Sequence, residues 1–280
     1  MEIVLMVLLG LTFGSFINVL IYRLPRGEGI LGIGWREEKR GRRDAIAAKQ
    51  YRHWDGRSRC PHCGHALVWY DLIPLVSWLG LGGRCRYCQT AISWRYPLVE
   101  LVIAGLLVGL VSIQPDVFSN PLLLLGWVII ICGLLAILII DFQHWVIPDK
   151  ILIVLVIAGG ALQSPSTWPS HLAAALLVGC FFWLAWQLSH KRGLGLGDVK
   201  LVAVLGWIFG PAGTVWVVYG ALLLGCAWGL TLLISRRGTL KSKLPFGTIL
   251  ALVALIYIYT STWWPDWLAQ ELELIRNLWI

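Results

Sequence analysis

The sequence predicts an all-α polytopic membrane protein, with about eight transmembrane helices and a cytoplasmic zinc-knuckle loop between the first two. Of its 280 residues, 58% are hydrophobic and only 14% are charged. The mean hydropathy is +0.74, well above that of ordinary soluble domains. Four cysteines in two C-x-x-C pairs lie in the first long polar segment.

The transmembrane helices are predicted from apolar runs, because about 18 apolar residues suffice to cross the bilayer core. The first run has no basic residues before it and no A-x-A-like site after it, so we expect a retained helix rather than a cleaved signal peptide. The fourth and sixth runs are the shortest. The runs cover residues 3–22, 97–113, 121–141, 150–163, 171–189, 199–211, 213–234 and 246–262.

The distribution of Lys and Arg predicts the orientation, because both residues favour cytoplasmic loops. With the N-terminus outside, residues 23–97 lie inside and carry 14 of the 23 basic residues, and the same alternation places eight more on that side. Loops 114–120 and 164–170 contain no Lys or Arg. We therefore expect both termini outside. The net charge of +8 fits basic loops beside an anionic lipid leaflet and requires no nucleic-acid partner.

Four parts are expected along the chain. They are a first transmembrane helix (1–22), a cytoplasmic zinc-binding loop domain with four cysteines (23–96), a seven-helix bundle (97–262) and an interfacial amphipathic tail (263–280). The tail is predicted from its Trp cluster and its apolar residues at helical spacing. The charged stretch 26–59 has few large aliphatic residues with which to form a core. No internal repeat is evident.

The paired cysteines predict a structural zinc site. Two C-x-x-C turns can supply four thiolates to one tetrahedral ion, which leaves no open position for catalysis. A pair of disulfides is the alternative, and the reducing cytoplasmic side disfavours it. The ligands are Cys60, Cys63, Cys85 and Cys88, with His62 and His65 expected at the surface. Three single cysteines in apolar runs are expected to be small core residues: Cys132, Cys180 and Cys226.

Two acids at the predicted cytoplasmic membrane edge are the catalytic candidates. Asp141 ends the third apolar run, and Asp198 begins the sixth. A carboxylate at membrane depth is costly and usually functional. Two carboxylates that share a site can hold one proton between them and activate water, which would hydrolyse a peptide bond without a metal.

Other polar residues near these acids remain alternatives. Asp149 could replace Asp141, although it follows a proline and resembles the start of a helix in a wet loop. Glu100 is either a third functional acid or, as we expect, a partner of Arg95. His144 is expected to line the site without a catalytic role.

The stretch "RGLGLGDVK" (192–200) surrounds Asp198 with glycines. It does not match a phosphate-binding loop or a dinucleotide fingerprint. Glycine offers backbone freedom and close approach. We expect Gly195 and Gly197 to admit an extended substrate, with a plain inter-helix turn as the alternative.

Several stretches together resemble the prepilin leader peptidases, the bifunctional peptidases and N-methyltransferases of type IV pili and type II secretion. They are "GSFINVLIYRLP" (14–25), "SRCPHCGH" (58–65), "WYDLIPLVSWLGLGGRCRYC" (69–88), "ISWRYPLVE" (92–100), "LIIDFQHWVIPD" (138–149), "GLGLGDVKL" (193–201) and "LPFG" (244–247).

This resemblance implies an intramembrane aspartyl protease of the G-x-G-D type in the bacterial inner membrane, with Asp198 in that motif and Asp141 as its partner. It implies prepilin or pseudopilin substrates, S-adenosylmethionine as methyl donor and pilus or secretion assembly components as partners. Gly83 matches a position linked to methyl transfer. Leu194 and Leu196 depart from the Met and aromatic residue that the family often has.

Two other functions explain part of the pattern. A non-enzymatic transporter or assembly scaffold would account for intramembrane acids, but not for the four cysteines or for both acids at one edge. A protease resembling signal peptide peptidase would share the G-x-G-D chemistry but would not be expected to carry the Cys-rich loop.

Overall fold

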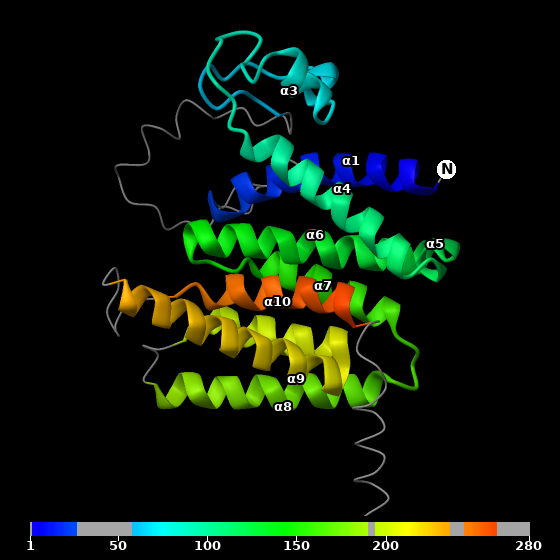
Figure 1. Cartoon of the computed structure of the whole chain (residues 1–280), viewed down its shortest axis with the longest axis vertical. Coiled ribbons are helices and arrows are strands. Elements are labelled where there is room, and N and C mark those ends of the chain that lie inside the picture. The colour runs from blue at the N-terminus through cyan, green and yellow to red at the C-terminus, as the bar shows by residue number, and fades with distance from the viewer. Residues whose placement is uncertain (1, 27–57, 190–193, 236–243, 262–280) are drawn as a thin grey trace, which may run out of the picture.

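The computed structural model describes residues 2–26, 58–189, 194–235 and 244–261, and within these ranges it is helical, with no β-strand beyond two isolated bridges. The long helices lie side by side in a stack, and the cysteine-containing segment stands at one end of it (Figure 1). The long helices are α1 (Glu2–Arg23), α4 (Arg95–Ile113), α6 (Pro121–His144), α7 (Asp149–Leu162), α8 (Trp168–Leu188), α9 (Leu196–Ile234) and α10 (Phe246–Thr260). The short ones are η1 (Leu24–Arg26), η2 (Trp69–Leu72), α3 (Val76–Gly80) and α5 (Asp116–Ser119).

The predicted all-α membrane class is confirmed. Five helices of the described part are long and apolar enough to cross a membrane, namely α1, α4, α6, α8 and α9, and α10 is a shorter apolar helix. Large apolar side chains such as Leu177 and Phe181 of α8 are mostly exposed. On a soluble protein these surfaces would form an unusually large apolar patch, whereas lipid tails are a suitable solvent for them.

α9 contains a break that separates the predicted sixth and seventh runs. Gly210 has φ 67° and ψ −170°, outside the helical region, and Pro211 follows it. Proline lacks the N–H that would continue the helical ladder. The predicted boundary between the runs 199–211 and 213–234 therefore falls at a real interruption of the helix, although the residues on both sides of Gly210 are helical.

The second half of α9 runs antiparallel to α10. Phe209 packs edge-to-face on Tyr257 near the end of α10, and Gly213 also lies against Tyr257. Gly229, by contrast, lies against Leu244, just before α10 begins. The start of α9 also lies beside the start of α10, because Asp198 of α9 is close to Gly247 of α10. The two halves of α9 therefore run in opposite directions.

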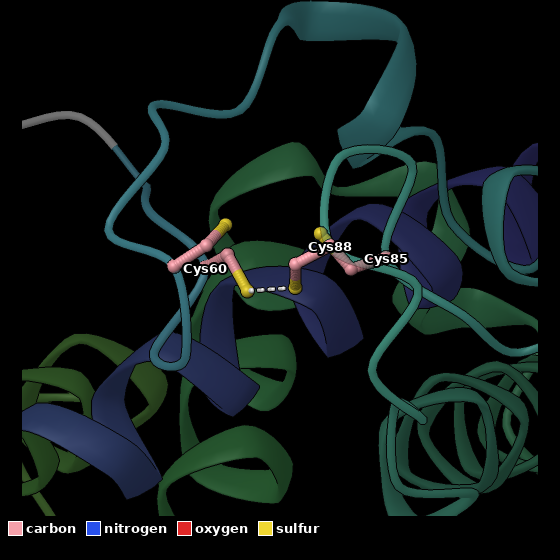
Figure 2. Close-up of side chains that lie close together, drawn as sticks. Cys60, Cys85 and Cys88 are labelled. Carbon is pink, nitrogen blue, oxygen red and sulfur yellow. Dashed lines mark hydrogen bonds between the residues drawn. The ribbon is translucent and has the colours of Figure 1, made fainter.

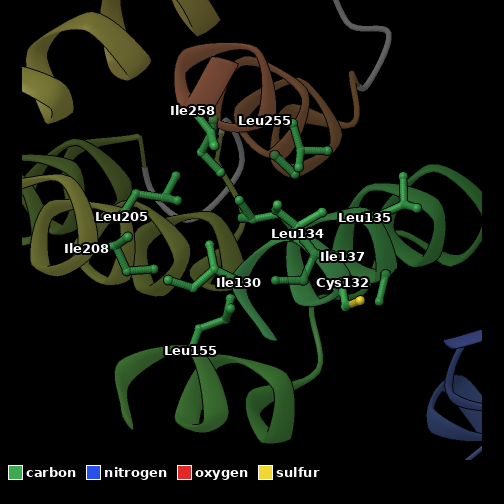
Figure 3. Packing of buried hydrophobic residues seen from close by; sticks show 14 of the residues in the cluster. Ile130, Cys132, Leu134, Leu135, Ile137, Leu155, Leu205, Ile208, Leu255 and Ile258 are labelled. Carbon is green, nitrogen blue, oxygen red and sulfur yellow. The ribbon is translucent and has the colours of Figure 1, made fainter. Parts of the chain in front are cut away.

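The core is centred on α6. Ile130, Leu134 and Ile137 of this helix are fully buried, and Figure 3 shows them between residues of α7, α9 and α10. α6 is therefore a fixed support for Asp141 in its last turn.

Small residues allow the closest helix contacts, as is common within membranes. A Cβ on Gly10 or Gly14 of α1 would lie 2.3 Å from Ala104 Cα or 2.5 Å from Glu100 Cα of α4, respectively. On α9, a Cβ on Gly206 would lie 2.8 Å from Ala175 Cα of α8. These three contacts leave no room for any side chain.

Some sequence predictions are corrected or lie outside the described residues. Cys132 is buried as expected, but Cys180 and Cys226 are exposed, so the prediction of core positions was wrong for these two. Both lie on apolar helices, where a small weakly polar thiol can face lipid. The amphipathic tail (263–280) and nearly all of the charged stretch 26–59 lie outside the described residues.

Candidate functional site

The structure brings Asp141 and Asp198 together. Asp141 is 5% exposed in the last turn of α6, and Asp198 lies in the first turn of α9. A Cβ built on Gly247 would lie 3.0 Å from Oδ2 of Asp141 and 3.0 Å from Oδ1 of Asp198. The two oxygens are therefore separated by at most twice that distance, and the carboxylates interact electrostatically.

Thr248 holds Asp141 in place. Its backbone N–H donates to Asp141 Oδ2 at 2.7 Å, and its hydroxyl Oγ1 donates to the same oxygen at 2.9 Å. All of these atoms are buried. Because Asp141 Oδ2 already accepts two hydrogen bonds, it does not carry the proton that the two carboxylates share. That proton therefore lies on Asp141 Oδ1 or on Asp198.

Asp198 is held by the glycine stretch that precedes it. The Gly195 N–H donates to Asp198 Oδ2 at 3.1 Å, and Gly247 lies beside the other oxygen, Oδ1. The hydrogen bond from Gly195 fixes the side chain of a residue whose own helix has only just begun. Both acids therefore have their orientation set by main-chain donors.

The glycines serve close approach rather than conformational freedom. Gly195 has φ −81° and ψ 144°, which any residue adopts, so its backbone conformation does not require glycine. A Cβ on Gly195 would lie 3.0 Å from Asp198 Oδ2, and one on Gly197 would lie 3.2 Å from Ile147 Cβ. Gly193 lies outside the described residues.

The alternative acid, Asp149, pairs with Lys200 rather than with Asp141 or Asp198. This ion pair is exposed, with 2.8 Å between Nζ and Oδ1. His144 is exposed at the end of α6. Neither residue hydrogen-bonds to Asp141 or Asp198 in the described structure.

The expected pairing of Glu100 with Arg95 was wrong. Glu100 is 7% exposed, and its Oε2 accepts the Leu75 N–H at 2.8 Å. Arg95 instead donates to Gln143 Oε1 at 2.8 Å. Residues five apart on a helix point about 140° away from each other, so these two side chains face different neighbours.

The four paired cysteines form a cluster that can hold a metal ion. The Sγ atoms of Cys60, Cys63, Cys85 and Cys88 all lie within 4.8 Å of one another, and those of Cys60 and Cys88 are 3.8 Å apart (Figure 2). No disulfide joins them. His65 stacks on Tyr87 with ring centroids 3.6 Å apart, and His62 is exposed, as expected for histidines that are not ligands.

The two cysteine turns repeat each other, which the sequence reasoning missed. "RCPHCGHA" (59–66) and "RCRYCQTA" (84–91) share the pattern R-C-x-x-C-x-x-A. Each turn is closed by an antiparallel bridge between its terminal Arg and Ala. Gly64 (φ 71°) and Gln89 (φ 59°) occupy the same left-handed position. Two like turns facing each other suit a tetrahedral four-thiolate site.

The thiol of Cys88 is poised to act as a ligand. Hydrogen bonds with Thr90, whose Oγ1 lies 3.3 Å from Sγ, and more weakly with the neighbouring thiols lower the pKa of Cys88 to about 6. The thiolate is the form that binds a metal.

Gly83, the residue linked by resemblance to methyl transfer, lies at the second cysteine turn. Its φ is +68°, and a Cβ would lie 3.0 Å from Trp78 Cζ2. The Trp78 indole donates to the Ile92 carbonyl at 3.2 Å. Backbone conformation and packing thus both favour glycine here.

Gly247 and Thr248 are the site residues that the sequence reasoning did not identify. Neither carries an ionisable side chain, so their chemistry gives little signal. The available signal was the stretch "LPFG" (244–247), which overlaps the start of the last apolar run and contains Gly247 but not Thr248. The resemblance had marked it without a role.

Comparison with known proteins gives two consecutive family matches. Residues 8–114 match the Bacterial Peptidase A24 N-terminal domain, and residues 128–230 match the Type IV leader peptidase family. No significant match was found among solved structures.

Curated relatives cover almost the full chain. A "Prepilin leader peptidase/N-methyltransferase" of Aeromonas hydrophila is 34% identical over 93% of this chain and 92% of its own length. One with the same description from Pseudomonas aeruginosa is 35% identical over 89% of this chain and 87% of its own length. A "Type 4 prepilin-like proteins leader peptide-processing enzyme" of Escherichia coli is 37% identical over 89% of this chain and 91% of its own length.

Proposed function

Because the chain belongs to the type IV leader peptidase family, we propose that Asp141 and Asp198 are the catalytic dyad with which it removes the leader peptide of a prepilin or pseudopilin. The protein is an enzyme with two activities, prepilin cleavage and N-methylation of the new N-terminal residue. The observation that carries the proposed dyad is the convergence of both carboxylates on one point beside Gly247.

The geometry suits metal-free peptide hydrolysis. Two carboxylates so close together share one proton, and the pair rather than either residue has the resulting pH profile. The unprotonated carboxylate takes a proton from water as the water oxygen attacks the peptide carbonyl. The protonated one donates to the carbonyl oxygen, and the amide nitrogen leaves as an amine after a second proton transfer.

Thr248, Gly195 and Gly247 would contribute by preorganisation. The hydrogen bonds from Thr248 and Gly195 fix the carboxylates before substrate binds, so little reorganisation is needed as charge develops. Gly247 leaves space between the acids, where the attacking water and the carbonyl must lie within hydrogen-bond distance of both.

The cysteine cluster would hold a structural zinc ion. Four thiolates at these distances fit a tetrahedral site with no position left for water. Such an ion would cross-link the two repeated turns in a segment that has few other core contacts. It supplies stability to the loop and takes no part in proteolysis.

The methyl donor is proposed to be S-adenosylmethionine, which would supply the methyl group to the new amine. Gly83 is proposed to contribute by shaping the second cysteine turn against Trp78.

The dyad is proposed to face the cytoplasm at the inner membrane. Among the described basic residues, Arg23, Arg26, Arg95, Lys150 and Lys200 lie on helix ends at or near the dyad end, as expected for the cytoplasmic side. We also propose that the chain comprises a first helix (1–22), a four-cysteine loop domain (23–96), a peptidase bundle (97–262) and a tail (263–280).

One reaction tests both activities. The purified protein is incubated with a prepilin, with and without S-adenosylmethionine, and the mature N-terminus is analysed by mass spectrometry. We expect cleavage in both samples and one added methyl group only with the donor. An uncleaved substrate would contradict the proposed peptidase activity, and a non-enzymatic transporter or scaffold would then be favoured.

A further inference from the structure

A lateral groove between α7 and the first half of α9 is the feature that the proposed mechanism leaves unused. It is a shallow, open groove with a volume of about 420 Å³. Its apolar walls are formed by Leu152, Ile153, Val156, Ile157 and Val204. Ile153 and Ile157 are 59% and 68% exposed. The groove therefore opens sideways, where a membrane-spanning protein meets lipid or another apolar chain.

Contacts between the two helices define both ends of the groove. At one end Lys200 pairs with Asp149 at 2.8 Å. At the other, Trp207 Nε1 donates to the Val156 carbonyl at 2.9 Å. From Lys200 to Trp207 the chain rises about 10 Å, which is two helical turns. The opening between these two contacts therefore spans about two helical turns.

The charged end of the groove adjoins the dyad on both walls. Lys200 lies two residues after Asp198 on α9. Asp149 lies two residues after Ile147, whose side chain packs against Gly197 and Gly247 beside the carboxylates. Along both chain segments, the groove therefore begins within about one helical turn of the dyad.

We propose that this groove seats the apolar segment of the substrate that follows the scissile bond. This inference rests on the proposed peptidase function. Cleavage at the membrane edge leaves one side of the cut at hydrocarbon depth, where only an apolar segment, preferably helical, is stable. Two turns of such a helix match the length of the groove. Lipid tails are as apolar as the groove walls, so the groove would favour the substrate segment over lipid by shape and packing rather than by hydrophobicity.

The test compares two substrates with the same cleavage site. One retains the complete apolar segment, and the other is a short peptide that ends a few residues after the cut. Ile153→Trp fills the middle of the groove. Leu176→Trp on α8 is the matched control, because Leu176 is also 59% exposed but does not line the groove.

Ile153→Trp should lower kcat/KM for the full-length substrate about tenfold, the effect of one misfitted apolar group, mainly through KM. It should leave the short peptide unchanged, and Leu176→Trp should change neither. A photo-crosslinking residue at position 153 should capture the full-length substrate, and one at 176 should not.

Equal loss for both substrates would place the damage at the dyad and overturn the proposal. No loss for either would show that the groove holds only lipid, which also overturns it. If the unaltered protein cleaved neither substrate, the proposed function would fail and this proposal with it, a result distinct from a selective loss.

Discussion

Replacing Gly247 with alanine should abolish cleavage without unfolding the protein. The added Cβ would lie 3.0 Å from an oxygen of each catalytic carboxylate and 2.7 Å from Ile147 Cδ1. The Ile147 methyl group is the end of a flexible side chain and can move aside. The carboxylates are held by main-chain donors, so the methyl group would instead occupy the space between them.

The magnitude follows from displacement of the reacting groups. A misplacement of about 1 Å costs about a hundredfold in rate, and we expect at least that loss in kcat. Stability should change little, because the nearest contact of the new Cβ, Ile147 Cδ1, is the end of a side chain that can move aside.

The assay measures initial cleavage rates of a prepilin in detergent or liposomes, with the melting temperature of each variant measured in parallel. Gly225→Ala is the control, because its Cβ would lie 3.7 Å from Ile249 Cδ1, an ordinary contact. Cleavage by Gly247→Ala at the rate of the control would refute the assigned geometry.

The remaining predictions concern the support of the site and the cysteine turns. Thr248→Val removes the hydroxyl donor to Asp141 but retains the backbone donor. Since a hydrogen bond to a charged group contributes about 1.5–3 kcal/mol, kcat should fall by roughly tenfold to a hundredfold. Thr248→Ser, which keeps a hydroxyl, should retain most of the activity. An unimpaired Thr248→Val enzyme would show that this hydroxyl is dispensable. Cys60→Ser and Cys85→Ser should each lower bound zinc, measured by elemental analysis, and make residues near the turns more sensitive to protease, while a chelator should do the same to the unaltered protein. Unchanged metal content in both variants would reject the proposed site.

The fold could be predicted to a large extent because the bilayer restricts the possible structures. Helix is the way a single apolar run can satisfy its backbone in hydrocarbon, so the positions of the runs predict the helices. Even the interruption at Gly210 coincides with the predicted boundary between two runs. The number of spans is still a prediction, since α7 has only 14 residues.

The proposed dyad could be predicted because charge at membrane depth is rare and costly. Asp141 and Asp198 stood out for that reason, and the alternation of the runs placed them at one edge. Their supporting residues could not be found in this way. Thr248 acts through a main-chain N–H and a hydroxyl, and Gly247 acts by having no side chain, so neither has a chemical signature in sequence.

The partner of Glu100 was predicted wrongly because proximity along the chain was taken for proximity in space. Its actual partner, the Leu75 N–H, belongs to a loop 25 residues earlier. That contact depends on how the cysteine-containing segment folds onto α4, which local sequence patterns do not encode. For the repeated cysteine turns, by contrast, the sequence did contain the information. Their shared pattern became evident only through their shared backbone conformation.

If Asp141 and Asp198 perform the proteolysis together, as proposed, neither can be replaced. The most direct test is the cleavage rate of Asp141→Asn and Asp198→Asn, each purified, matched for melting temperature to the unaltered enzyme and given the same prepilin. Because one proton must be shared between two carboxylates, we expect each single change to reduce cleavage to the background rate. Substantial cleavage by either well-folded variant would contradict the account.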